Sequence, residues 1–384
     1  MLEPQPVPVH GGPLILRSLD PVALEVPLPV PTLTPFGEVR TVVALLVLAR
    51  DADGVEGWGE IWCNFPRFGY RHRAALLREA FAPALIGVTL PTLSAAWNRM
   101  SAATNALRLQ SGEYGPFAAV AAGIDIALHD IAARKAGMPV WQMLGGASSR
   151  VRVYASLGRF DDWRPTIENA HARGFRAFKL RSAGGIGNHL SVLGPARSLV
   201  GGECDLMLDL NGSWDVGSAI EDVKQLREFD LAWLEEPIPV DAPDESWARL
   251  AEAAPMPLAG GENMVSGQMF DAALRQRALS VLQPDITKWG GFTAGLPLAK
   301  RIVASGTRCC PHMFTGAPGV LASAHLLAAA GTDDGMLEYG AGFNPTRDEF
   351  LDRPPSGGFL ELPETPGLGF APDPQRLDRY RVPA

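Results

Sequence analysis

Seven polar positions recur at a near-constant interval along the second half of the chain, and each follows a short apolar run. They are Lys179/Arg181, Asp209, Glu235, Glu262, Asp285, His312 and Glu338. Counted from Arg181, the successive steps are 28, 26, 27, 23, 27 and 26 residues. A strand, a loop, a helix and a return loop need about this many residues, since eight such units make a barrel of roughly 250. Because parallel strands of a barrel end at one mouth, the spacing predicts a site as well as a fold.

Length and composition limit the remaining possibilities. A chain of 384 residues is long for one core, so we expect a barrel with a smaller second domain. The formal net charge of −8, without a long basic run, gives no reason to expect a nucleic-acid partner. The start of the chain lacks a signal-peptide pattern and the apolar stretches are short for a bilayer, so we expect no membrane partner. Four cysteines without metal-site spacing predict reduced thiols in a cytoplasmic protein.

The first third of the chain has mixed patterns. Alternating apolar residues, as in 41–49, predict strands, and 51–54 is typical of a turn between two of them. Helical spacing follows at 74–86, 93–108 and 117–136, and the last of these ends near Gly137 and Pro139. We therefore expect an α+β unit before the barrel.

From about residue 150 the chain alternates strand-like and helical segments. The strand-like runs are 151–156, 177–180, 206–210, 232–234, 257–259, 280–282, 307–310 and 336–337. Among the helices between them, one is expected to begin at Ser218 with a capping box to Glu221, and another to span 296–305 and end at Gly306. Eight strands alternating with helices favour a (β/α) barrel over an open doubly wound sheet.

Asp209, Glu235 and Glu262 end three consecutive predicted strands. Three carboxylates at one barrel mouth would repel one another unless a cation compensates. Oxygen ligands select a hard dication, Mg²⁺ before Mn²⁺ or Ca²⁺, and argue against Zn²⁺. Any one of these acids alone is as well explained by a helix cap or a surface charge, but three in register predict a metal site.

His312 and Asp285 end neighbouring predicted strands. An Asp carboxylate against one imidazole nitrogen fixes the tautomer, raises the basicity of the ring and leaves the other nitrogen free to take a proton. Glu338 ends the last strand and faces Lys179 and Arg181. It either donates a hydrogen bond to a developing oxyanion, if it stays protonated, or forms an ion pair with one of the two cations.

These residues stand in recognisable motifs. They are Lys-x-Arg at 179–181, Asp-x-Asn at 209–211, Glu-Glu-Pro at 235–237, Gly-Glu-Asn at 261–263, Pro-Asp-x-x-Lys-x-Gly-Gly at 284–291 and Pro-His at 311–312. With Glu338, and with residues 122–130 and 144–146 before the barrel, the set resembles the enolase superfamily, specifically its mandelate racemase subgroup. The resemblance covers essentially the whole chain.

The resemblance implies a fold and a set of roles. The fold is a modified (β/α)₇β barrel at 141–355, under an α+β capping domain at 1–140 that is completed by the C-terminal segment 356–384. Asp209, Glu235 and Glu262 would bind one Mg²⁺, with Mn²⁺ as a substitute. His312 and Asp285 would form the acid/base dyad, Glu338 would face the enolate oxygen, and Lys179 and Arg181 would line the opposite face. Homo-oligomers are common in this family.

One position departs from the family's pattern. Many members carry Lys at both ends of the Lys-x-Lys motif, and the second serves as a base, whereas this chain has Arg181. A guanidinium stays protonated and makes a poor base. A racemase needs an acid/base on each face of the carbanion, while one base suffices for β-elimination. We therefore expect dehydration of an acid sugar, an aldonate or aldarate, to a 2-keto-3-deoxy acid.

Other activities stay open at this point. The family's cycloisomerases, which open a sugar lactone or an anhydro ring, are the first alternative, and a racemase or epimerase of a 2-hydroxy acid is the second. A metal-dependent hydrolase is disfavoured because such sites usually use His ligands. A non-catalytic binding barrel is disfavoured by the complete set of polar positions.

The carboxylate substrate should meet the capping loops at 32–39 and 61–73. Trp62, Arg67 and Tyr70 of the second loop are candidate substrate-binding residues, and they suit a polar or acidic distal end if the loop is not simply a solvated surface. Asn211 and Asn263 stand beside metal ligands and are candidate substrate or second-layer donors.

Overall fold

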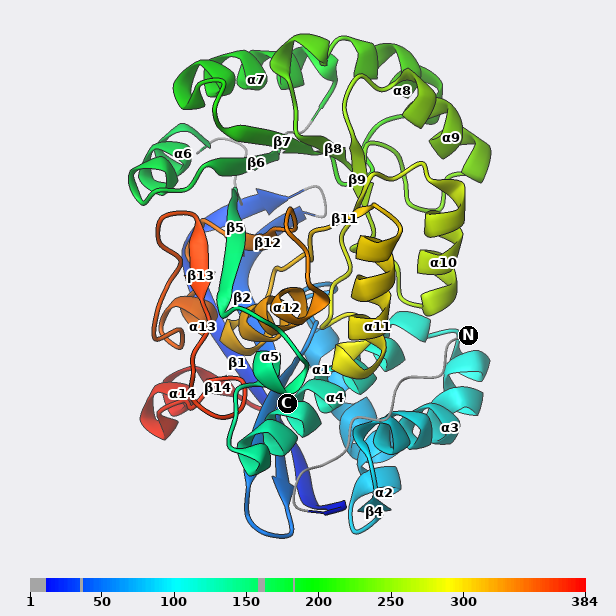
Figure 1. The fold of residues 1–384 in the computed structure, drawn as a ribbon, viewed down its shortest axis with the longest axis vertical. Helices are drawn as coiled ribbons and strands as arrows, with labels where there is room; N and C mark the ends of the chain where they lie inside the picture. Colours follow the sequence, from blue (N-terminus) through cyan, green and yellow to red (C-terminus); the bar gives the residue numbers. More distant parts are fainter. Residues whose placement is uncertain (1–11, 35–36, 158–162, 182–183) are drawn as a thin grey trace.

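The computed structural model describes residues 12–34, 37–157, 163–181 and 184–384. They form an antiparallel sheet with helices, built from the start of the chain, and a closed barrel built from the rest (Figure 1). The capping loop at 32–39 lies partly outside the described residues. This mixed α/β architecture is the predicted one.

The capping sheet is antiparallel with the order β14-β1-β2-β3, and β4 pairs with β1. Its strands are β1 (Leu14–Thr34), β2 (Gly37–Asp51), β3 (Glu56–Ile61) and β4 (Thr89–Leu90). Along β2, Leu45, Val47 and Ala49 join the core under the N-terminal helices, while Ala44, Leu46 and Leu48 join the barrel-side core. The period of two follows from the alternation of side chains along a strand. The sheet therefore lies between the helices and the barrel.

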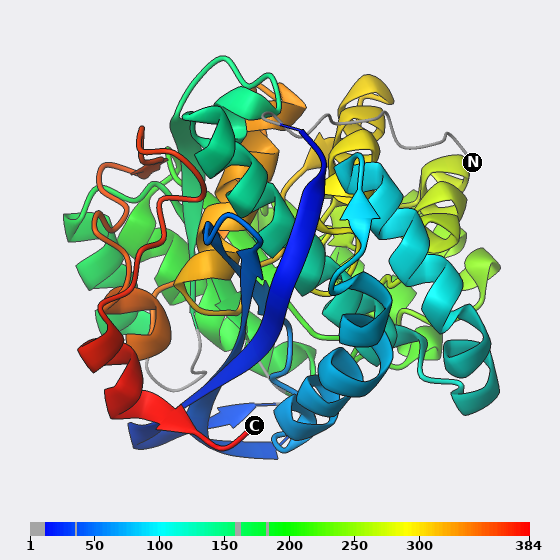
Figure 2. The ribbon, with the colours of Figure 1, turned by 90° about the horizontal axis from the view of Figure 1, so that it is seen from below.

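Helices pack on one face of this sheet (Figure 2). They are α1 (Gly69–Leu76), a π-helical turn (Leu77–Phe81), α2 (Ala82–Leu85) and α4 (Tyr114–Ala136), while α3 (Leu93–Ser111) packs on α4, and α5 (Val140–Met143) lies between α4 and the barrel. Among the described residues, only α4 is long and apolar enough to cross a membrane, but 83% of its apolar window is buried inside the protein. That burial is typical of a core helix.

The barrel strands follow one another in space as in sequence, in the order β11-β10-β9-β8-β7-β6-β5-β12. They are β5 (Arg150–Ser156), β6 (Ala177–Arg181), β7 (Asp205–Asp209), β8 (Trp233–Glu235), β9 (Leu258–Gly260), β10 (Val281–Leu282), β11 (Arg308–Cys309) and β12 (Leu337–Gly340). The amide of Glu338 donates to the carbonyl of Pro311 over 3.2 Å, which joins the two ends of the sheet. The ring is therefore closed.

Helices alternate with the strands and form the outer layer (Figure 1). They are α6 (Trp163–Ala172), α7 (Ile186–Val200), α8 (Val216–Lys224), a 3₁₀ turn (Arg227–Phe229), α9 (Asp244–Ala253), α10 (Gly267–Gln276), α11 (Gly291–Ala304) and α12 (Ala317–Ala330). Inside the ring, one buried side chain from each strand or its flank fills a layer: Tyr154, Ala177, Met207, Trp233, Ala259, Val281, Cys310 and Met336. The barrel is therefore a packed core rather than a pore.

Two predicted helix starts are wrong. Helix α8 is capped by Asp215, whose Oδ1 accepts from the amide of Gly217 over 2.9 Å, so Ser218 lies inside the first turn. Helix α11 begins at Gly291 rather than 296. The first turn of α8 is largely exposed and carries no apolar pattern, whereas the first turn of α11 is buried but rich in glycine, which has a low helix propensity.

The C-terminal segment contacts both parts of the molecule. It contains β13 (Phe359–Glu361), α14 (Pro374–Tyr380) and β14 (Arg381–Val382), and it follows the short helix α13 (Pro345–Asp348). Strand β13 pairs with β5 of the barrel, and β14 pairs with β1 of the capping sheet. The four cysteines are free and buried, as expected.

Candidate active site

The three predicted metal ligands meet at the mouth of the barrel. Asp209 ends β7 and Glu235 ends β8, where the two residues are direct partners in the parallel ladder, and Glu262 follows β9. One carboxylate oxygen from each lies within 4.8 Å of the others, and all three side chains are buried. Neighbouring β-strands that end in register thus place three oxygen donors around one point.

Lys179 lies below these carboxylates and is fully buried. Its Nζ is 2.5 Å from Glu235 Oε1, 3.0 Å from Glu338 Oε1 and 3.5 Å from Asp209 Oδ2. Burial alone favours the neutral amine, but the surrounding carboxylates outweigh it, so the pKa of Lys179 is raised. In this arrangement Lys179 is a cation and not a base.

Arg181 is the cation of the rim. Its Nε is 3.3 Å from Asp209 Oδ2, and its Nη2 is 3.9 Å from Glu338 Oε1. The guanidinium also lies over the ring of Phe314, at 5.4 Å from the centroid. Burial opposes the charge, yet Asp209 and Glu338 hold the pKa of Arg181 above its ordinary value. Arg181 is thus placed to carry positive charge throughout the working pH range.

His312 and Asp285 form the predicted pair. The Nδ1 of His312 lies 2.8 Å from Asp285 Oδ2, and the other oxygen of Asp285 accepts from the amide and the hydroxyl of Thr287 at 2.8 and 2.6 Å. This fixes the ring and turns Nε2 toward Glu262 Oε2, at 3.1 Å. Burial lowers the pKa of His312, but Glu262, Glu338 and Asp285 outweigh that effect and raise it.

Glu338 forms an ion pair, which was one of the two alternatives that the sequence allowed for it. It contacts Lys179 at 3.0 Å, and its Oε2 accepts from Tyr154 Oη and from the amide of Met313, both at 3.3 Å. Burial alone would raise its pKa, but Lys179, His312 and Arg181 lower it. A carboxylic acid kept neutral by surrounding negative charge is therefore not what this arrangement shows.

The carboxylate of Glu235 has neighbours that the sequence analysis missed. Gln283 Nε2 donates to its Oε2 over 2.6 Å, and Trp233 Nε1 donates to the same oxygen over 3.1 Å. Burial, reinforced by Asp209 and Glu338, still raises the pKa of Glu235 to about 8. Buried oxygens this crowded are stabilised as anions by added positive charge, so the donor set fits a hard dication.

The two asparagines beside the metal ligands differ. Asn263 Nδ2 donates to both oxygens of Glu236 at 3.2 and 3.0 Å and to Glu262 Oε1 at 3.3 Å, while Lys288 donates to its Oδ1. Asn263 therefore orients the carboxylates as a second-layer residue. In Asn211 it is the backbone N–H that donates to Asp209 Oδ1, over 2.9 Å.

The three capping-loop candidates are dispersed. Arg67 lines the cavity above the site, but Tyr70 is buried in the capping core, with its hydroxyl accepting from Arg71, so its assignment to substrate is wrong. Trp62 packs on the Lys288 ammonium, at 4.4 Å from the ring centroid. The ring of Tyr70 packs in the capping core, and the polar pattern of the loop did not indicate this.

Glu60 is a second residue that the sequence analysis missed. It ends β3 and is fully buried, and its two oxygens accept from the amides of Gly316 and Gly319 at 2.7 and 2.9 Å. Those amides open helix α12, directly after the loop that carries His312. The signal was a lone acid inside the apolar run 58–62, after the predicted turn at 51–54.

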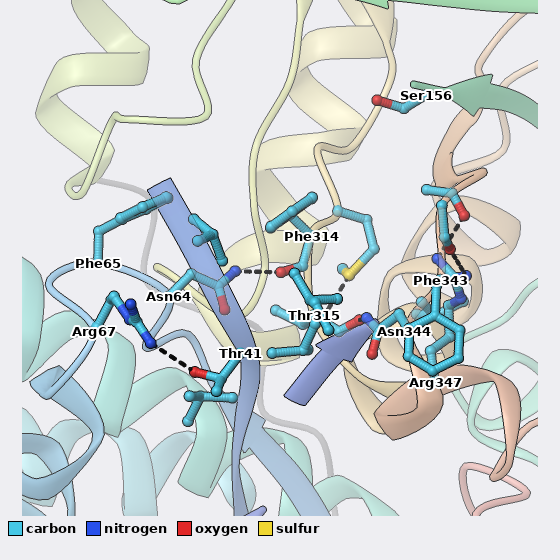
Figure 3. Close-up of a pocket in the computed structure, with 18 of the residues that line it drawn as sticks. Thr41, Asn64, Phe65, Arg67, Ser156, Phe314, Thr315, Phe343, Asn344 and Arg347 are labelled. Atoms are coloured by element: carbon cyan, nitrogen blue, oxygen red, sulfur yellow. Dashed lines mark hydrogen bonds between the residues drawn. The ribbon is translucent and has the colours of Figure 1, made fainter. Parts of the chain in front are cut away.

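A cavity of about 420 Å³ lies between the capping strands and the loops at the mouth of the barrel (Figure 3). Ser156, which hydrogen-bonds Glu338, and Met313, which follows His312, form its inner end. The capping strands β1 and β2 form another wall. The cavity therefore adjoins Glu338 and His312 through Ser156 and Met313.

Two family models match most of the chain. Residues 20–145 match the mandelate racemase / muconate lactonizing enzyme N-terminal domain, and residues 164–376 match the enolase C-terminal domain-like family. The chain is 30% identical over 356 residues to D-galactarolactone cycloisomerase of Agrobacterium fabrum, covering 88% of this chain and 91% of that one. It is 27% identical to arabinonate dehydratase of Saccharolobus solfataricus, covering 83% and 85%.

Solved structures share the whole architecture. A mandelate racemase/muconate lactonizing enzyme from Bordetella bronchiseptica has a TM-score of 0.89 at 39% identity, with 96% of this chain and 99% of that one covered. A racemase from Streptomyces coelicolor with bound magnesium has a TM-score of 0.85 at 25% identity, with 96% and 100% covered. The chain belongs to the enolase superfamily, within its mandelate racemase/muconate lactonizing enzyme branch.

Proposed function

We propose that this chain removes the proton next to the carboxylate of a hydroxy acid in a Mg²⁺-dependent reaction and then eliminates water from the adjacent carbon. The observation that carries the proposal is the His312–Asp285 pair on one side of the carboxylate triad, with Lys179 and Arg181 on the other. The relatives named dehydratase and cycloisomerase support this class of chemistry.

Asp209, Glu235 and Glu262 would hold the ion, with Mn²⁺ as a substitute. When bound, Mg²⁺ supplies positive charge to the substrate carboxylate, which becomes doubly negative on loss of its α-proton. Arg181, at the rim, adds a cation that does not change protonation state. Glu338 orients Lys179 and Met313, and these contacts hold the floor of the site in place.

His312 would take the α-proton. Asp285 holds Nδ1, so Nε2 is the atom that accepts the proton. The resulting imidazolium then returns the proton to the departing hydroxide on the next carbon, and water leaves. The enol that remains converts to a 2-keto-3-deoxy acid, so one base completes the reaction.

A cycloisomerase is the second candidate. Two relatives, D-galactarolactone cycloisomerase and 3,6-anhydro-α-L-galactonate cycloisomerase, carry that name at 30% and 28% identity. In that reaction the same base removes the α-proton, but a ring oxygen on the same molecule leaves. Both reactions need one base, so both agree with the cationic, non-basic Arg181.

The experiment that tests the proposal follows the α-proton directly. We expect the protein with Mg²⁺ to incorporate deuterium from D₂O into a reactive hydroxy acid or to convert it to a 2-keto acid. Treatment with EDTA should abolish both signals, and added Mg²⁺ should restore them. The His312→Asn variant should lose at least about 10²-fold of the rate, the range expected for a general base.

His72→Asn is the matched control, because His72 is on the surface and pairs with Glu113. Its rate should equal that of the wild type. Full turnover in EDTA, or an unimpaired His312→Asn variant, would disprove the proposal. Labelling of both enantiomers of a chiral acid would instead establish a racemase.

We further propose that the protein works without a nucleic-acid or membrane partner, as a homo-oligomer in a reducing compartment such as the cytoplasm. The buried free thiols support the compartment. Sedimentation velocity of the full chain tests the oligomer.

A further inference from the structure

The cavity beside the candidate active site has a largely apolar lining. It is bounded by the following apolar side chains: Leu28, Val30, Val39, Val43, Phe65, Met313, Phe314, Val320 and Phe343. At about 420 Å³ it lies in the size range of small-ligand pockets. The residues come from β1, β2, the loop after β3, the loops after β11 and β12, and the first turn of α12, so every wall contributes apolar surface (Figure 3).

The rim of this cavity exposes large apolar side chains. Val30 is 58% exposed, Phe343 55% and Phe314 41%, and these are among the most exposed large hydrophobic residues of the described chain. A single exposed apolar residue needs no explanation, but a group of them around one cavity marks a binding surface. A ligand that covered them would remove this surface from water.

The polar side chains of the cavity are largely engaged with the protein itself. Asn344 Nδ2 donates to the carbonyl of Thr315 over 3.1 Å, and its Oδ1 accepts from the hydroxyl of Thr346 over 2.6 Å. The amide nitrogen of Asn64 donates to the carbonyl of Phe314. Arg347 donates to the carbonyls of Gly340 and Gly342 at 2.6 and 2.9 Å. These side chains shape the walls and are not directed at a ligand.

Other polar groups of the cavity are partly engaged in the same way. Arg67 Nη2 donates to the hydroxyl of Thr41 over 3.1 Å, and the hydroxyl of Thr315 lies 2.7 Å from the sulfur of Met313. A substrate hydroxyl that entered here would lose its bonds to water and gain few in return, which costs binding energy. The cavity therefore disfavours a hydroxylated chain at this end of the substrate.

We propose that the substrate is a 2,3-dihydroxy acid whose end remote from the carboxylate is a compact alkyl or aryl group, seated between Val30, Phe314 and Phe343. This proposal rests on the proposed function and replaces the expectation of an acid-sugar tail. The C2–H bond breaks with its proton passing to His312, and the C3–O bond breaks with that proton returned to the leaving hydroxide. The products are water and a 2-oxo acid that keeps the apolar group.

Three five-carbon-chain acids with the same reacting carbons test the proposal. They are 2,3-dihydroxy-4-methylpentanoate, a pentonate and a pentarate, each assayed as all C2 and C3 stereoisomers with Mg²⁺ for 2-oxo acid formation. We expect kcat/KM for the methyl-branched acid to exceed that for the pentonate by about 100-fold, the discrimination that a few apolar groups provide. A faster pentonate, or a faster pentarate bound through Arg67, overturns the proposal.

A binding measurement separates this proposal from the proposed function. Calorimetry with Mg²⁺ compares 4-methyl-2-oxopentanoate with 4,5-dihydroxy-2-oxopentanoate, the corresponding dehydration products. Tighter binding of the methyl-branched acid supports the apolar pocket even if no dihydroxy acid turns over, in which case only the proposed reaction fails. Equal or tighter binding of the hydroxylated acid overturns the pocket assignment whatever the reaction is.

Variants of the rim assign the effect to its residues. Phe314→Ser and Phe343→Ser should each weaken binding of 4-methyl-2-oxopentanoate by about tenfold, because each removes apolar contact area. Phe68→Ser is the matched control, since Phe68 is 68% exposed and does not line the cavity. Unchanged binding in both rim variants, or an equal loss in the control, contradicts the proposal.

Discussion

At the scale of single residues, the chemistry of the site depends on which of its cationic side chains can lose a proton. Lys179 is surrounded by Glu235, Glu338 and Asp209, which hold it protonated, and Arg181 is a guanidinium. His312 is thus the base that the geometry provides. This asymmetry is what separates a one-base elimination from a two-base racemisation, and it depends on one side chain.

Arg181→Lys tests that asymmetry. A lysine ammonium, unlike a guanidinium, can lose its proton. We therefore expect the variant to have a second acid/base group on the face opposite His312. The variant should epimerise the α-carbon of a substrate that the wild type only dehydrates, measured by chiral chromatography of the unreacted acid. Arg181→Gln is the control, since an amide cannot relay a proton. Epimerisation by the wild type itself would refute the one-base interpretation.

At the scale of elements, helix α12 begins with no cap from its own chain segment. Its N-cap is Gly316, and the cap is supplied by Glu60 of the capping sheet. The approach is close: a Cβ on Gly319 would lie 2.1 Å from Thr315 Oγ1 and 3.1 Å from Glu60 Oε2. A glycine is required there, and the loop from His312 to Gly316 is held between the barrel strand and this cap.

Glu60 therefore makes the stability of the protein depend on pH. Burial raises the pKa of Glu60 to about 7, despite the two backbone amides, and Asp285 adds to the increase. A carboxyl whose folded pKa exceeds its unfolded value binds more protons in the folded state, so its contribution to stability decreases as pH rises between the two values. The contribution lost from pH 5 to pH 8 is about 3 kcal/mol, at 1.36 kcal/mol per pKa unit.

Glu60→Gln should remove this dependence. Because the amide does not ionise, the stability of the variant relative to the wild type should increase between pH 5 and pH 8, even if the variant is the less stable at pH 5. Urea denaturation at each pH measures the difference. Glu56→Gln, at the exposed start of the same strand, is the control and should show no such trend. If the difference in unfolding free energy between variant and wild type were the same at every pH, the raised pKa of Glu60 would be contradicted.

The sequence predicted the barrel strands and the residues at their ends, because both follow from local patterns. Short apolar runs at a constant interval require little tertiary information, and Asp209, Glu235 and Glu262 come together once the strands are parallel. The apolar cavity was not predictable in the same way. Its walls come from segments around residues 30, 65, 314 and 343, and no local pattern brings these together.

The polar composition of 61–73 was misleading for a physical reason. Tyr70 is in the capping core, and Arg73 donates to the carbonyl of Gly69 over 3.1 Å. Polar residue types predict a polar pocket only if their donors are free, and in helix α1 such donors are taken up by nearby carbonyls. From this loop, Asn64, Phe65 and Arg67 line the cavity.

At the scale of the whole molecule, the two parts are joined at several places. Strand β14, which follows the barrel in sequence, pairs with β1 of the capping sheet. The backbone N–H of Trp62 donates to the carbonyl of Thr287, and Glu60 caps α12. We expect one unfolding transition rather than two. Hydrogen exchange under rising urea should give the same midpoint for peptides of β2 and β7. A capping sheet that opens at lower urea than the barrel would show that these contacts do not couple the parts.

The register of β1 against β2 shifts between Pro27 and Thr32, so the intervening residues do not follow the regular ladder of the sheet. Leu28, Pro29 and Val30 of this irregular stretch line the cavity. Segments outside the regular pairing of a sheet vary more readily in side chain and in length than the paired strands do. Related proteins can therefore differ in substrate preference through changes in this stretch, which lines the cavity. The residues of the barrel mouth that break bonds in the substrate stay the same.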